Sequence, residues 1–197
     1  MSQRKFITIA GICLTVSLFI TYTAWSFFKE TQLKKLPVLG QVENFQLYDE
    51  QGREFSLSRL EGNIWIANFF FTTCGDICPV MSRNMAALHR TFEMIDGVTL
   101  VSITVNPEMD SSGVLKAYAA KYNADTDKWH FLTGPRTQIQ ELAVKSFKLG
   151  SIEEPIFHSP KFALVDRQGL IRGYYDGVQS GEVSQLFKDV ALLLKEK

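Results

Sequence analysis

Apolar and polar residues alternate over two short stretches, residues 44–48 and 54–57, which flank a polar segment. The intervening residues 49–52, Asp-Glu-Gln-Gly, are typical of a tight turn. Alternation bounded by turn residues predicts a β-hairpin. A second hairpin is predicted for residues 161–166 and 170–174, which alternate around Arg167, Gln168 and Gly169.

One stretch is almost continuously apolar. Residues 63–71 read Asn-Ile-Trp-Ile-Ala-Asn-Phe-Phe-Phe, a run of strand length. Such runs occur in strands that are covered on both faces, so we expect residues 63–71 at the centre of a sheet. Residues 98–105 and 129–132 are predicted to form two further strands.

Helical spacing begins behind Pro79, where Met81, Met85, Leu88 and Phe92 recur every three or four residues. Proline is favoured at the first helical position, and Gly97 ends the segment. Further helices are predicted from a cap at Asp110, Ser111 or Ser112 to Tyr122, over residues 135–147 and over residues 182–195. This order of elements predicts an α/β sheet of mixed direction with helices on both faces.

Residues 6–28 form one apolar run without a charged residue. About 20 such residues cross a bilayer as a helix, so we predict a transmembrane anchor at 6–28, behind a short tail at 1–5. The run is longer than the core of a cleavable signal, and Tyr22 spoils the small-residue pair ending at Ala24. An uncleaved anchor is therefore expected, with Cys13 as a membrane-embedded side chain. Residues 29–42 are predicted to be a linker and residues 43–197 one domain.

The composition excludes one class of partner. Hydrophobic residues make up 46% of the chain and charged residues 21%, which is typical of a globular protein. Lys plus Arg equals Asp plus Glu, at 21 each, so no basic surface favours nucleic acid.

Cys74 and Cys78 are the candidate working residues, in the segment Cys-Gly-Asp-Ile-Cys-Pro between the apolar strand and the helix. Backbone N–H groups at a helix N-terminus stabilise a thiolate. Three intervening residues allow both sulfurs to meet, so the pair can close to a disulfide or clamp a soft metal ion, Cu(I) or Zn(II).

A third ligand would most naturally be a histidine. His89 follows in the next helix and is expected to face solvent, and His130 is expected to point outward from its strand. His158 lies in a loop before the second hairpin, and the residues alone leave its role open. Met81 and Met85 are expected in the core, and Asp76 is expected to be a turn residue.

The residues 69–79, Phe-Phe-Phe-Thr-Thr-Cys-Gly-Asp-Ile-Cys-Pro, resemble the signature of the SCO/SenC proteins. The resemblance continues in residues 101–110 and 128–134, and resumes at His158-Ser159 and residues 163–166. It covers roughly residues 41–194. It implies a thioredoxin-like α/β fold with an added N-terminal β-hairpin, preceded by one transmembrane helix, with the domain on the extracytoplasmic side.

The resemblance also implies that Cys74, Cys78 and His158 bind copper, as Cu(I), Cu(II) or both, for assembly of cytochrome oxidase. Two departures put the site's affinity and redox potential in doubt, because the family usually has Pro where this chain has Gly75 and often Asp where it has Asn106. Glycine loosens the loop, and Asp110 can partly substitute for the missing charge.

The leading hypothesis is a metallochaperone, rather than an enzyme, that delivers copper to an oxidase subunit. The main alternative is a membrane-anchored thiol–disulfide oxidoreductase that uses Cys74 and Cys78 on cysteines of an oxidase copper site and is itself served by a thiol reductant. A peroxidase of peroxiredoxin type is the third class, and the paired cysteines fit it less well.

Overall fold

A six-stranded mixed sheet forms the centre of the unit Leu36–Lys197, one of two units into which the chain divides. The computed structural model describes residues 15–23, 25, 35–150 and 159–196. The strand order is β1-β8-β7-β4-β5-β6. β4 pairs parallel with β5 and β5 parallel with β6, whereas β7, β8 and β1 join antiparallel. The predicted sheet of mixed direction is confirmed.

The elements follow the apolar pattern closely. The strands are β1 (Gly40–Gln41), β2 (Gln46–Tyr48), β3 (Glu54–Ser56), β4 (Ile64–Phe70), β5 (Val98–Thr104), β6 (Trp129–Leu132), β7 (Lys161–Val165) and β8 (Leu170–Asp176). The helices are η1 (Leu57–Arg59), α2 (Cys78–Phe92), α3 (Ser112–Lys121), α4 (Arg136–Glu141), the π-helix η2 (Leu142–Ser146) and α5 (Ser180–Lys195).

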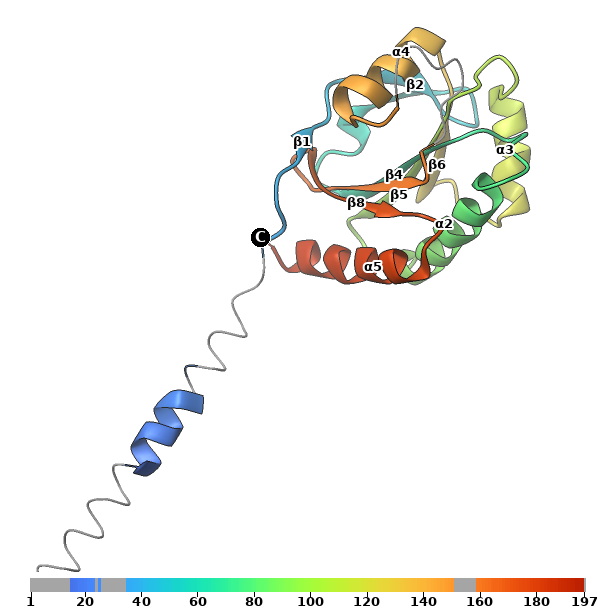
Figure 1. Cartoon of the computed structure of the whole chain (residues 1–197). Helices are drawn as coiled ribbons and strands as arrows, with labels where there is room; N and C mark the ends of the chain where they lie inside the picture. The colour runs from blue at the N-terminus through green and yellow to red at the C-terminus, as the bar shows by residue number, and fades with distance from the viewer. Residues whose placement is uncertain (1–14, 24, 26–34, 151–158, 197) are drawn as a thin grey trace, which may run out of the picture. The chain divides into compact units, whose positions relative to one another are not determined.

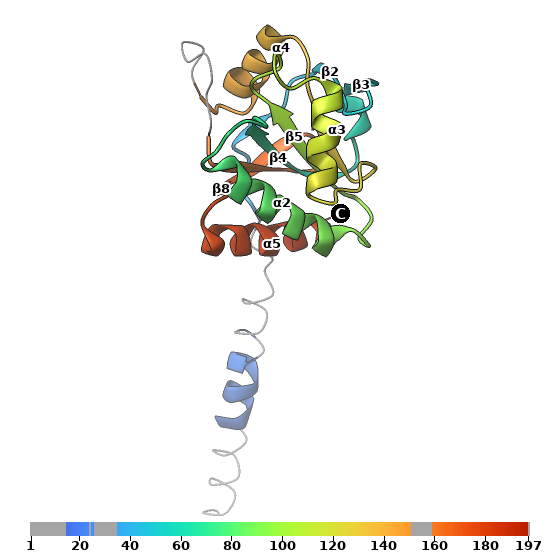
Figure 2. The ribbon, with the colours of Figure 1, turned by 90° about the vertical axis from the view of Figure 1, so that its right-hand side faces the viewer.

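Two hydrophobic layers sandwich the sheet. α2, α3 and α5 bury apolar side chains on one face, and α4, η2 and the hairpin β2–β3 cover the other face (Figure 1). Figure 2 shows α2 and α5 running along the same side of the sheet. Every residue of β4 is buried, because its side chains alternate between the two layers: Ile64 and Ile66 face one, and Trp65 and Ala67 the other. This is the predicted central strand.

The first predicted hairpin forms as β2–β3 and lies over the second layer. Leu47 pairs with Phe55, and both are fully buried. Tyr48 and Thr133 exchange two backbone hydrogen bonds of 2.7 and 2.8 Å, which tie the hairpin to the chain leaving β6.

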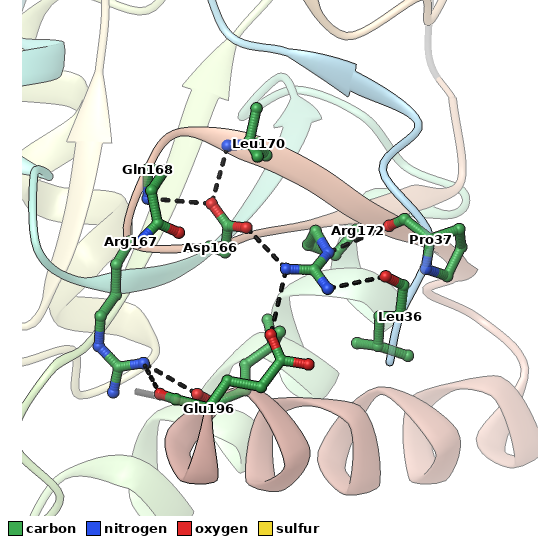
Figure 3. Close-up of polar contacts among 9 residues, drawn as sticks. Leu36, Pro37, Asp166, Arg167, Gln168, Leu170, Arg172 and Glu196 are labelled. Atoms are coloured by element: carbon green, nitrogen blue, oxygen red, sulfur yellow. Dashed lines mark hydrogen bonds and ion pairs between the residues drawn. The ribbon is translucent and has the colours of Figure 1, made fainter. Parts of the chain in front are cut away.

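The end of the predicted linker belongs to the sheet. Gly40 and Gln41 form β1 against β8, and Leu36 is buried in the first layer. Arg172 of β8 fixes this entry segment, since its guanidinium donates to the carbonyls of Leu36 and Pro37 and to the carboxylates of Asp166 and Glu196 (Figure 3).

Residues 15–23 of the unit Met1–Lys35 are helical. No helix within the described ranges is long and apolar enough to cross a membrane. The predicted anchor at 6–28 lies largely outside the described residues, as does Cys13.

Candidate metal centre

The two cysteines flank the turn between β4 and α2. β4 ends at Phe70, and the chain turns at once, with the Cys74 N–H donating to the Phe71 carbonyl at 3.3 Å. α2 begins at Cys78 with Pro79 in its first turn, as expected for a residue that lacks an N–H donor. The predicted strand–loop–helix placement of the pair is confirmed.

Cys74 lies where backbone dipoles favour its thiolate. Burial raises the pKa of Cys74, but N–H donors from the backbone of Asp76, Cys78 and Ile77 and a contact with the Cys78 thiol outweigh burial, so the pKa falls below its ordinary value. Cys74 is 9% exposed, so the more acidic thiol is also the less deeply buried one of the pair.

Cys78 is the opposite kind of thiol. It is fully buried, and burial raises the pKa of Cys78 to about 12, although an N–H donor from Phe71 acts against this shift. The two thiols are free and in hydrogen-bond contact. This asymmetry gives one nucleophilic sulfur and one sulfur that can close a disulfide with it.

Two of the histidine predictions were wrong. His89 is 4% exposed, with its ring packed 5.9 Å from that of Trp129, and burial lowers its pKa. It lies eleven residues after Cys78 along α2, roughly 16 Å away. His130 is 6% exposed, because the hairpin β2–β3 covers it and the Phe55 ring lies 4.7 Å from its own. Neither histidine reaches the thiol pair.

The other side chains weighed as ligands behave as expected. Met81 and Met85 are fully buried in the first layer. Asp76 lies in the exposed bend, and its backbone N–H, rather than its carboxylate, contacts Cys74. Gly75 is exposed, with nothing within 4 Å of where a Cβ would stand.

His158 lies outside the described residues. The chain becomes described again at Ser159, just before β7. β7 is antiparallel to β4, with Phe162 opposite Asn68, so Ser159 and Pro160 lie toward the end of β4 that leads to Cys74. Within the described ranges, no group of three or more His, Cys, Asp or Glu side chains is arranged to hold a metal ion.

The sequence analysis did not predict one contact of the cysteine turn, that between Asp110 and Thr72. Asp110 was expected as a possible helix cap and as a partial substitute for the charge missing at Asn106. In the structure α3 begins at Ser112 behind Ser111, and the Asp110 carboxylate is buried against Thr72 and Thr104. The spacing of Thr72 two residues before Cys74 was visible in the sequence. Its contact with Asp110 depends on the packing of β4 beside β5.

The chain is similar in sequence to known proteins. The family model described as SCO1/SenC matches residues 38–195. The SCO1 protein homolog of Bacillus subtilis is 37% identical over 163 residues, covering 79% of this chain and 84% of that protein. A protein of Stutzerimonas stutzeri described as a putative copper-binding protein is 29% identical over 181 residues, covering 87% and 86%.

The fold is also similar to those of solved structures. A SCO1/SenC family lipoprotein from Bacillus anthracis superposes with a TM-score of 0.73 at 31% identity, over 79% of this chain and 96% of that one. BsSco, described as a Sco-family cytochrome c oxidase assembly protein with a disulfide switch, gives 0.72 at 33% identity, over 83% and 100%. Yeast Sco1 with copper bound gives 0.60 at 28% identity, over 79% and 90%. These matches confirm the thioredoxin-like α/β fold, and the chain belongs to the SCO1/SenC family.

Proposed function

We propose that this protein binds copper through Cys74, Cys78 and His158 and delivers it to a copper site of a respiratory oxidase. The observation that carries the proposal is the contact between the two thiols at the start of α2. Two soft sulfur donors at one point suit Cu(I). The copper-bound structure of yeast Sco1 supports the same ion here.

His158 is proposed as the third ligand. His89 and His130 are packed against aromatic rings away from the turn, which leaves His158 among the three histidines of the chain. The described residues that follow it lie toward the cysteine end of β4. Imidazole and thiolate together form a donor set that copper accepts.

Copper is the cargo of this site. Three donors leave a position at which a donor of the receiving subunit can enter, so the ion can pass by ligand exchange, one donor at a time. Binding requires deprotonated thiols. Oxidation of Cys74 and Cys78 to a disulfide removes both sulfur donors and releases the ion.

We propose that residues 6–28 anchor the domain at 43–197 to a membrane, on the extracytoplasmic side. The apolar run is long enough to span the bilayer. The lipoprotein relative from Bacillus anthracis supports attachment to a membrane. Carbonate extraction of membranes that carry the protein tests the anchor, since a protein released by carbonate has no embedded helix.

The test of copper binding is a titration of the reduced, full-length protein with Cu(I) against a competing chelator. One tight equivalent is expected, and His158→Ala is expected to weaken it at least about tenfold, the loss typical of a perturbed metal site. His89→Asn serves as the matched control, because it removes a histidine that lies outside the site. A His158→Ala protein that binds like the wild type would remove His158 from the site.

The acidic Cys74 beside the buried Cys78 favours a second candidate function, that of a thiol–disulfide reductase for cysteines of an oxidase copper site. The disulfide switch described for BsSco supports redox activity of such a pair. The discriminating measurement is reduction of an oxidised dicysteine peptide. A reductase keeps its rate in His158→Ala and loses it in Cys74→Ser, whereas a copper carrier shows no turnover with the peptide.

A further inference from the structure

A fully buried carboxylate lies beside the cysteine turn. Asp110 is 0% exposed and accepts three hydrogen bonds. The Thr72 N–H donates to Oδ2 at 3.1 Å, the Thr72 hydroxyl to Oδ1 at 2.5 Å, and the Thr104 hydroxyl to Oδ2 at 2.5 Å. Hydrogen bonds to a carboxylate are shorter and stronger than those between neutral groups.

These bonds join two separate pieces of the chain. Thr72 lies in the turn after β4, two residues before Cys74, while Thr104 is the last residue of β5. The Thr104 hydroxyl also accepts the Asn106 N–H at 3.0 Å, and the Asp110 N–H donates to the Asn106 carbonyl at 3.0 Å. Hydrogen bonds within the loop from Thr104 to Asp110 therefore fix the Asp110 carboxylate. The carboxylate in turn binds both the backbone N–H and the side-chain hydroxyl of Thr72.

The residue before Thr72 contacts both cysteines. The Phe71 carbonyl accepts the Cys74 N–H at 3.3 Å, and the Phe71 N–H donates to the Cys78 sulfur. Fixing the Thr72 peptide fixes the orientation of Phe71, and with it the approach of the two sulfurs. A disulfide forms only within a narrow range of Cα and Cβ separations, so small shifts of this turn alter the balance between dithiol and disulfide.

We propose that Asp110 is a positioning residue that sets the dithiol–disulfide equilibrium of Cys74 and Cys78 by holding Thr72 in the turn. The inference rests on the proposed function in that it takes these cysteines as the working pair. In the structure the Asp110 contacts coexist with two free thiols. Loss of the Asp110 contacts destabilises the reduced, dithiol form of the turn more than the disulfide form, because in the disulfide a covalent bond to Cys78 holds Cys74 in place.

The equilibrium is measured in metal-free glutathione buffer, where electrons balance between two couples. Cys74 and Cys78 lose two electrons and two protons as their S–S bond forms. Glutathione disulfide takes up the two electrons and the two protons, so its S–S bond breaks and two glutathione thiols form. Alkylation of the remaining thiols and mass measurement give the oxidised fraction of the full-length protein.

In Asp110→Asn, one acceptor oxygen is replaced by a donor, so the three donors can no longer all be satisfied. We expect the equilibrium constant to move at least about tenfold toward the disulfide, which is a potential lower by about 30 mV. Asp166→Asn is the matched control. Asp166 is also buried and accepts three bonds, from Gln168, Leu170 and Arg172, but it lies at the other end of the sheet.

Thr72→Val provides a milder variant that removes one hydroxyl donor and keeps the backbone bond to Asp110. It is expected to shift the equilibrium in the same direction by about threefold, and it decides the question if Asp110→Asn does not fold. Circular dichroism and the urea midpoint establish folding of each variant.

An Asp110→Asn equilibrium within twofold of the wild type overturns the proposal, and so does an equal shift in Asp166→Asn. A wild-type pair that stays reduced at every glutathione ratio also overturns it, because no equilibrium is then set. Failure of the proposed function gives a different result: the wild-type protein binds no Cu(I), while the metal-free equilibrium still responds to Asp110.

Discussion

At the scale of single residues, Gly75 is the departure from the family pattern that lies between the cysteines. The φ angle of Gly75 does not lie in the left-handed region, and a Cβ at this position would meet nothing within 4 Å. Gly97 differs, because its φ of +79° lies in the left-handed region, where a side chain is strained. The structure therefore demands glycine at position 97 and not at position 75.

Gly75→Ala is expected to raise the free energy of unfolding of the reduced protein by about 0.4–1 kcal/mol. The gain arises because alanine restricts the unfolded chain while fitting the native backbone. Urea unfolding followed by circular dichroism measures it. Gly97→Ala is the matched control and is expected to destabilise the protein, so an equal loss in both variants would contradict the role assigned to Gly75.

At the scale of elements, the packing of the hairpin β2–β3 on β6 encloses His130 in a site that disfavours its charged form. Burial and the nearby Arg59 guanidinium lower the pKa of His130 to about 4, although Asp49 acts in the opposite direction. Its Nδ1 is buried without a hydrogen-bond partner among the described residues. The neutral ring is held by contact with Phe55.

The sign of the resulting pH dependence follows from that shift. In the unfolded chain His130 takes up a proton near its ordinary pKa of about 6.5, whereas in the folded protein it does so near 4. The contribution of His130 to the free energy of unfolding is fully present above pH 6.5 and is lost as the pH falls toward 4. Between pH 7.5 and pH 5 the loss is about 2 kcal/mol.

Urea unfolding at both pH values, in the wild type and in His130→Leu, measures this contribution as a difference of differences. The leucine variant is expected to lose less stability on acidification by about 2 kcal/mol. His89→Leu is the comparison for a buried histidine away from the hairpin. Parallel pH profiles for the wild type and His130→Leu would show that His130 takes up its proton at the same pH in the folded and unfolded states, which contradicts the lowered pKa.

The elements themselves were largely predictable, because apolar periodicity reports which faces are buried. The run at 63–71 and the alternation at 44–48 and 54–57 became β4 and the hairpin. β1 was missed because two residues, Gly40 and Gln41, carry no period and pair with β8 far along the chain. The sequence does not say where the hairpin lies, and for that reason His130 was expected on an exposed face.

His89 was misplaced for a local reason that the sequence did contain. It follows Met85 by four residues, so both side chains lie on the same buried face of α2. The thiol pair was predictable because its chemistry and its strand–helix context are both local. The contact between Asp110 and Thr72 spans 38 residues and arises only when β5 pairs with β4, which no local pattern encodes.

At the scale of the whole molecule, Arg172 joins the two ends of the unit Leu36–Lys197. Its guanidinium donates to the Leu36 carbonyl at 2.7 Å and to the Pro37 carbonyl at 3.1 Å. It donates to Asp166 at 2.8 Å and to Glu196, just after α5, at 3.3 Å. Arg172 is 8% exposed and Asp166 is 4% exposed, so the Asp166 carboxylate has little access to water as a substitute partner.

Arg172→Met is expected to lower the free energy of unfolding by about 3–5 kcal/mol, because it leaves the buried Asp166 carboxylate without its cation. Urea unfolding measures the loss. Amide exchange at Leu39, which donates to Ile171, is expected to accelerate more than exchange in β4, since the entry segment loses its two carbonyl contacts first.

The double variant Asp166→Asn/Arg172→Met separates pairing from packing. If the cost of Arg172→Met is mainly an unpaired buried charge, neutralising Asp166 removes that cost, and the double variant is less destabilised than the sum of the single variants. Strict additivity would assign the loss to the carbonyl contacts of Leu36 and Pro37 instead. In that case the chain entering the domain, rather than the ion pair, is what Arg172 stabilises.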